Sequence, residues 1–180
     1  MLALPGLLYD NCGMSEKRSA LLLICFGVFV ILVAMAYGVY QQRISQIGPA
    51  PLPGEIAGLP LRGRVVGVPT LDELSWMHGQ EFQLNQGAVG SYGEITLYVA
   101  GTPLSFMAGR MIRDMRDRIA SADTPFTLLA ERDYGRRTVY ELAGMGQKHY
   151  YFRSGNLVVW LAVNENADEL ALQHALEFYP

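Results

Sequence analysis

One uninterrupted apolar stretch dominates the hydrophobic pattern of the chain. Residues 20–40 contain no Asp, Glu, Lys or Arg. At a rise of about 1.5 Å per residue, a helix over these residues spans about 30 Å, the thickness of the hydrocarbon core of a bilayer. The pattern therefore predicts a single transmembrane helix at 20–40 in a lipid bilayer, preceded by an N-terminal extension at 1–19.

The N-terminal region leaves two alternatives open. Ala34-Met35-Ala36 has the small-residue spacing of a signal-peptide cleavage site. The apolar run continues through Val39, and no polar region precedes the small residues, so we expect a retained anchor rather than cleavage after Ala36. Met14, which is followed by a charged segment, is an alternative start to Met1.

The basic residues that flank the apolar stretch predict its orientation. Lys17 and Arg18 precede it, and Arg43 is the nearest basic residue after it. Basic residues favour the cytoplasmic side of a membrane. We therefore expect a single-pass protein of the cell (inner) membrane, with a cytoplasmic N-terminus and an extracytoplasmic C-terminal domain.

Small residues lie on one side of the predicted membrane helix. At about 100° per residue, Gly27, Ala34 and Gly38 fall within about 40° of one another. In lipid, small residues allow a second helix to approach closely, and packing then drives association. We interpret these residues as an interface with an integral membrane subunit. The alternative is that Gly and Ala are common in membrane helices generally.

A proline-rich segment follows the apolar stretch. Proline removes an amide donor and disfavours helix at the residue before it. The sequence therefore predicts an extended, semi-rigid spacer at 41–61 that separates the membrane helix from a domain at 62–180. The prolines of this spacer are Pro49, Pro51, Pro53 and Pro60.

From residue 62 onward, patterns typical of strands and helices alternate. Capping residues and apolar stripes predict helices at 70–78, at 102–121 and from 166 onward. Thr102 with Pro103 marks the start of the second of these helices. Short Gly-containing loops join the last four predicted strands and are typical of antiparallel neighbours. The predicted strands are 62–68, 82–92, 94–100, 126–132, 138–143, 148–153 and 157–164.

This order of elements predicts an α+β fold. The strand at 157–164 is apolar at nearly every position, which is typical of a central strand covered on both faces. We expect an antiparallel β-sheet packed against two or three helices. The arrangement resembles that of small ligand-free modules that dock onto photosynthetic and respiratory membrane assemblies.

Charge and cysteine content narrow the choice of partners. The formal net charge is −3, and no basic cluster provides the electrostatic footprint of a nucleic-acid-binding protein. The two cysteines, Cys12 and Cys25, both precede the predicted domain, which therefore has neither a disulfide framework nor a thiolate metal site. We expect no nucleic-acid partner, no small-molecule partner and no cofactor.

Histidine and methionine could bind a metal, but their spacing does not favour it. The three histidines are isolated from one another and match no metal-binding motif. Thioethers select Cu(I), yet the regularly spaced methionines share one stripe with Leu104 and Ile119, so we expect them to pack in the core. The residues concerned are His78, His149 and His174, and Met107, Met111 and Met115.

Two further groups are candidates for a ligand or partner surface. The aromatic group could line a ligand pocket, although aromatic residues also form strands whose alternate members face the core. The arginine group surrounds one predicted turn and could bind an anion or an acidic patch of a partner; a solvated turn is the alternative. The first group is Tyr150, Phe152 and Trp160, and the second is Arg132, Arg136 and Arg137.

The leading functional hypothesis is a non-catalytic, single-pass accessory subunit. The sequence contains no catalytic constellation, and the segment 90–93 lacks the first glycine of a nucleophile elbow. Such a subunit would dock on a larger membrane protein complex, for which a respiratory or photosynthetic electron-transfer complex is the expected kind. The alternatives are a membrane-tethered small-ligand-binding or sensor domain and a copper-handling protein.

Overall fold

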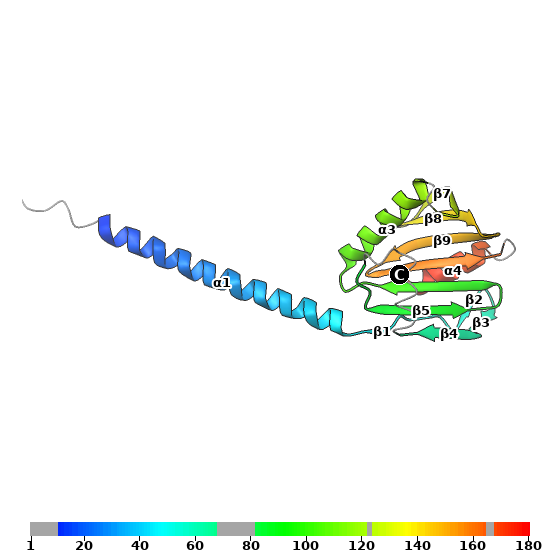
Figure 1. Cartoon of the computed structure of the whole chain (residues 1–180), viewed down its shortest axis with the longest axis horizontal. Helices are drawn as coiled ribbons and strands as arrows, with labels where there is room; N and C mark the ends of the chain where they lie inside the picture. The colour runs from blue at the N-terminus through cyan, green and yellow to red at the C-terminus, as the bar shows by residue number, and fades with distance from the viewer. Residues whose placement is uncertain (1–10, 68–81, 122–123, 165–167) are drawn as a thin grey trace, which may run out of the picture. The chain divides into compact units, whose positions relative to one another are not determined.

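The structure, a computed structural model, describes residues 11–67, 82–121, 124–164 and 168–180, and for 11–18 it describes the backbone alone. The chain forms two compact units, Met1–Gln42 and Arg43–Pro180, which are described separately. The short helix predicted at 70–78 lies outside the described residues. Helices and strands are labelled as in Figure 1.

The first unit consists of most of α1 (Asn11–Ser45), a helix of 35 residues. Its section Ser19–Ser45 is long and apolar enough to span a membrane. Every side chain at 19–39 is exposed in the isolated chain, and a helix that is apolar on all sides needs a protein core or a bilayer around it. The helix begins before residue 20, so part of the predicted extension at 1–19 is helical.

The second unit is built on one sheet, whose strands run side by side in the order β1–β5–β6–β10–β9–β8–β7, with β4 also pairing with β5 (Figure 1). All neighbouring pairs are antiparallel except β1 with β5. The bounds are β1 (Gly48–Pro49), β4 (Gly63–Val66), β5 (Gln86–Ser91), β6 (Ile95–Gly101), β7 (Phe126–Tyr134), β8 (Arg137–Gly144), β9 (Gln147–Ser154) and β10 (Leu157–Val163). A separate ribbon pairs β2 (Glu55–Ile56) with β3 (Leu59–Pro60).

The strand β10 lies in the middle of this sheet, between β6 and β9. Its alternate side chains enter two different hydrophobic cores, with Val159 and Leu161 in one and Val158 in the other. Because side chains alternate between the faces of a strand, the sheet needs cover on both sides. The predicted α+β fold, with a central, doubly covered last strand, is confirmed.

Among the described residues, one helix packs on each face of the sheet. The helix α3 (Ser105–Ala120) packs Ala108, Met111 and Met115 against the face that carries Val158. The helix α4 (Asp168–Phe178) packs its apolar side against the opposite face.

The helix α3 begins later than the sequence predicted. Leu104 is its N-cap and makes no side-chain capping bond. Thr102, expected to cap the helix, instead donates its hydroxyl to the Leu104 carbonyl oxygen at 2.8 Å. The Thr102 amide also donates to the carbonyl oxygen of Asn156 at 2.9 Å. The threonine therefore fastens the start of α3 to the turn between β9 and β10.

The proline-rich segment is packed into the second unit rather than standing free as a spacer. Ala50 and Ile56 are fully buried in the core under α4. The Tyr92 hydroxyl donates to the Pro53 carbonyl oxygen at 2.7 Å, and the Tyr179 hydroxyl donates to the Pro51 carbonyl oxygen at 2.6 Å. An extended proline-rich backbone offers carbonyl acceptors that its own residues cannot satisfy, and these tyrosines supply the donors.

Among the described residues β7 is the edge strand of the sheet at the end opposite β1. Its pairing with β8 shifts by one residue between Leu128 and Ala130, so Leu129 is an extra residue that forms a bulge. Bulges bend a strand and increase its twist. Leu129 is 52% exposed.

Substitutions of two isoleucines test whether the proline-rich segment is part of the folded core. Ile56→Ala removes a fully buried side chain, and we expect it to lower the free energy of unfolding by about 2–5 kcal/mol. Ile47→Ala changes a side chain that is 54% exposed, and we expect a change within about 0.5 kcal/mol. Denaturant unfolding of the full chain in detergent measures both, and equal effects would contradict the packing of this segment.

Candidate functional site

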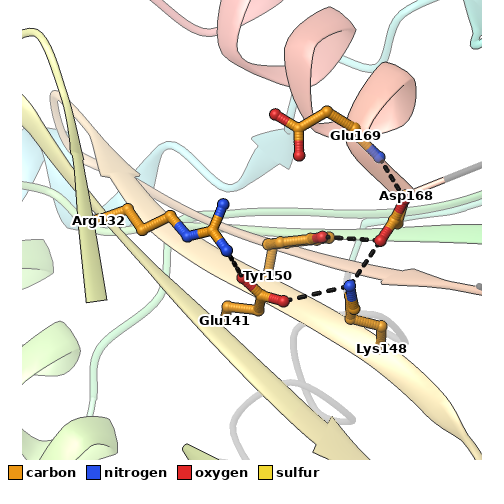
Figure 2. A network of polar contacts seen from close by, with 6 residues as sticks. All are labelled: Arg132, Glu141, Lys148, Tyr150, Asp168 and Glu169. Atoms are coloured by element: carbon orange, nitrogen blue, oxygen red, sulfur yellow. Dashed lines mark hydrogen bonds and ion pairs between the residues drawn. The ribbon is translucent and has the colours of Figure 1, made fainter. Parts of the chain in front are cut away.

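A charged network links α4 to the sheet on the face that α4 covers, as Figure 2 shows. The Glu141 carboxylate is paired with Arg132 Nη2 and with Lys148 Nζ, each at 3.2 Å. Lys148 Nζ also lies 2.6 Å from Asp168 Oδ2 at the start of α4, and the Tyr150 hydroxyl donates to the same oxygen at 3.4 Å. Strands β7, β8 and β9 therefore each contribute a side chain to holding the start of α4.

The electrostatics of this network favour its charged state. The hydrogen bond from Lys148 lowers the pKa of Asp168, and the same bond raises the pKa of Lys148. Burial is the main cause that raises the pKa of Tyr150, with the carboxylates of Asp168 and Glu141 adding to it. Glu141 is only 7% exposed, and its two cations offset the cost of burying its charge. The network is thus internally neutralised and holds the fold together.

The aromatic residues proposed as one pocket lie on opposite faces of the sheet. Tyr150 and Phe152 are buried in the core under α4. Trp160 packs against the other core and stacks on Tyr151 at a ring-centroid distance of 5.4 Å. The three therefore do not line a common pocket.

His149 is buried beside Trp160 and is held in one tautomer. Trp160 Nε1 donates to His149 Nδ1 at 3.1 Å, so Nδ1 accepts and the proton must be on Nε2. His149 Nε2 then donates to the Gly144 carbonyl oxygen at 3.0 Å. Burial lowers the pKa of His149, which keeps the ring neutral near pH 7. Both ring nitrogens are engaged in structural hydrogen bonds.

The remaining candidate metal ligands are placed apart. His174 Nδ1 accepts from the Ala57 amide at 3.0 Å and fastens the proline-rich segment to α4, while His78 lies outside the described residues. Met111 and Met115 are buried in the core, as expected from their shared stripe with Ile119, whereas Met107 is half-buried and lies outside this core. Within the part of the chain that the structure describes, no three His, Cys, Asp or Glu side chains come together as metal ligands.

A small hollow of about 280 Å³, here called the arginine hollow, lies beside α3. Three exposed arginines from separate elements line it: Arg113 from α3, Arg136 from the turn between β7 and β8, and Arg153 from β9. Gly109, Ile112, Arg137, Thr138 and Tyr140 complete the lining. No carboxylate is among these residues, so the hollow gathers positive charge.

The charges of the hollow are not neutralised within the described residues. The i,i+4 pair of Arg110 with Asp114 forms at 3.6 Å, as its spacing predicts. Asp117, at the same spacing from Arg113, is paired instead with Arg116 at 3.1 Å. No ion pair to a described carboxylate is found for Arg113, Arg136 or Arg153. This leaves the guanidinium groups of the hollow available to an anion.

The arginines that the sequence grouped around one turn have three different roles. Arg132 belongs to the charged network. Arg137 Nη1 donates to the carbonyl oxygens of Leu176 and Tyr179 at the end of α4. Of these three arginines, Arg136 lines the hollow and makes no ion pair with a described carboxylate. Sequence analysis missed Arg113 and Arg153, because sheet pairing and helix packing, rather than sequence spacing, bring them there.

Comparison of the chain with protein-family models, with curated proteins and with solved structures finds no match.

The charged network predicts a specific loss of stability in acid. Lys148 lowers the pKa of Asp168 below its ordinary value of 3.8 in the folded protein. The resulting stabilisation is complete above that value and is lost as the pH falls through the folded pKa. We therefore expect Asp168→Asn to lower the thermal midpoint by a constant amount above about pH 5 and by progressively less below about pH 4.

Circular dichroism of the full chain in detergent between pH 3 and 7 measures this dependence. Glu169→Gln is the matched control, since it removes the neighbouring, exposed carboxylate of the same helix turn. A midpoint difference for Asp168→Asn that stays unchanged across the whole range would contradict the network.

Proposed function

We propose that the protein is a non-catalytic, single-pass accessory subunit that docks on a larger membrane protein complex. The observation that carries this proposal is the helix section Ser19–Ser45, whose apolar side chains are exposed on all sides. Such a surface is stable only where lipid or other membrane helices surround it. A second, folded unit follows on the same chain.

The small-residue side of α1 supports contact with other membrane helices. Gly27, Ala34 and Gly38 lie along one side of the helix. Helix association in lipid depends on close backbone approach, which such residues allow. Integral membrane subunits are therefore the proposed partners, and a respiratory or photosynthetic electron-transfer complex is the proposed kind of assembly.

The buried polar side chains make hydrogen bonds and ion pairs within the fold, which supports a non-catalytic role. The buried histidine, His149, uses both ring nitrogens for hydrogen bonds within the fold. The buried carboxylate, Glu141, is paired with two cations. A general base or acid needs a group that can exchange its proton with a substrate, and these groups are instead engaged in holding strands and helices together.

The proposed location is the cell (inner) membrane, with the domain on the extracytoplasmic side. The support for this orientation is the excess of basic residues before the apolar stretch, Lys17 and Arg18 against Arg43. A membrane-tethered ligand-binding domain is the second candidate, and the arginine hollow is the observation that favours it.

Separation of native complexes after extraction in mild detergent tests the docking role. We expect the protein to migrate with a larger assembly, whose other subunits mass spectrometry of the same band then identifies. Ala34→Leu places a large side chain on the small-residue face, and we expect about a three- to tenfold smaller co-migrating fraction.

The matched control is Ala36→Leu, the same substitution about 180° around the helix from Gly27. We expect this variant to co-migrate like the parent protein. A free species near the chain mass of 19.9 kDa in the parent preparation would overturn the proposal. An equal decrease in the co-migrating fraction for Ala34→Leu and Ala36→Leu would overturn the assigned helix face.

A further inference from the structure

We propose that the arginine hollow is a binding site for a phosphate group, carried either by a soluble phosphate compound or by a lipid headgroup. The inference concerns the second unit alone and does not depend on the docking role proposed above. It rests on the convergence of guanidinium groups and on the absence of carboxylates among the described lining residues, with a glycine beside two of the arginines.

Two guanidinium groups reach toward the same point above α3. A Cβ atom placed on Gly109 would lie 3.2 Å from Arg153 Nη1 and 3.9 Å from Arg113 Nη1. Arg153 Nη1 has a long contact of 3.4 Å with the Ser105 carbonyl oxygen, which directs it across the helix surface. The two positive side chains thus approach the same position on the helix surface, beside Gly109.

Gly109 is an unfavourable residue for its position in the fold. It lies in the interior of α3 (Ser105–Ala120), where glycine is less stable than any ordinary residue except proline. A Cβ atom at this position would lie 3.2 Å from Arg153 Nη1, a tight contact that the glycine avoids. This use of glycine is typical of places where a backbone is approached closely by another group.

A bound anion would stabilise the clustered positive charges of the hollow. Like charges repel at short range, and arginine cannot relieve this repulsion by losing its proton. Thr138, which also lines the hollow, donates its hydroxyl to Asp133 at 2.9 Å. The donors left to a ligand are therefore chiefly the guanidinium groups of Arg113, Arg136 and Arg153.

Phosphate fits this donor set better than a carboxylate does. A phosphate monoester carries a charge of about −1.5 to −2 at pH 7 and three acceptor oxygens, whereas a carboxylate has one charge and two oxygens. The planar guanidinium fork binds phosphate in a bidentate manner. A volume of about 280 Å³ suits one small headgroup or phosphate ester rather than a large ligand.

Isothermal titration of the full chain in non-ionic detergent with inorganic phosphate tests the site. Ionic strength is held constant, because exposed charges are screened by salt. We expect Arg153→Gln and Arg113→Gln each to weaken binding about tenfold or more, as removal of a charge-assisted hydrogen bond does. Arg110→Gln, on the same helix but paired with Asp114 outside the hollow, is the matched control and should bind like the parent.

The variant Gly109→Ala distinguishes an effect on phosphate binding from an effect on folding. Alanine stabilises a helix interior, so we expect the thermal midpoint without phosphate to stay the same or to rise. The added Cβ should shift the guanidinium end of Arg153 by a few tenths of an ångström, and we expect phosphate binding to weaken by about threefold or less. Parent-like binding by both Arg113→Gln and Arg153→Gln, or equal weakening by Arg110→Gln, would overturn the proposed geometry.

Two further ligands identify the source of the phosphate group. Binding of glycerol 3-phosphate assigns the site to soluble phosphate compounds, whereas binding of short-chain phosphatidic acid in mixed micelles alone assigns it to a lipid headgroup. Either result supports phosphate recognition. If acetate binds as tightly as phosphate, or if neither phosphate compound binds, the proposal is overturned.

Discussion

The central position of β10 is the constraint on which the rest of the domain depends. A strand that is apolar on both faces cannot leave either face in water. One face is covered by α3, while the other requires α4 together with the proline-rich segment, whose Ile56 lies in the same core as Val159. The unusual feature of the fold, a proline-rich stretch bound to tyrosine hydroxyls, follows from the need to complete this second cover.

Charge is used differently on the two sides of the sheet. Under α4, cations and carboxylates are paired closely enough to shift each other's proton affinity, as in the contact of Lys148 with Asp168. Beside α3, Arg113, Arg136 and Arg153 gather without described carboxylate partners. The net charge of the whole chain is −3 and does not reveal this separation. A local basic site therefore occurs in a protein whose overall charge is negative.

Sequence patterns predicted the sheet well because its turns carry their own local chemistry. Gly135 and Gly155 take positive φ angles of 66° and 58° between the last strands, as such hairpins require. Local sequence patterns could not predict the contacts between segments that are distant in the chain. Proline spacing predicted an extended backbone but not what packs against it, and the separation of Trp160 from Tyr150 depends on strand register. For the arginine hollow, the sequence contains one local indication, which is the presence of Gly109 within an amphipathic helix.

The bulge at Leu129 has a consequence for how the edge of the sheet meets other chains. Anchoring of α1 in a membrane, as proposed above, would restrict the molecules to two dimensions, where neighbouring copies meet more often than they do in solution. A straight, apolar edge strand would offer each neighbour a row of unpaired amides and carbonyls, the template for sheet-to-sheet aggregation. The extra residue in β7 interrupts that row next to exposed Leu128, so the bulge shortens the regular edge that a neighbouring strand could pair with.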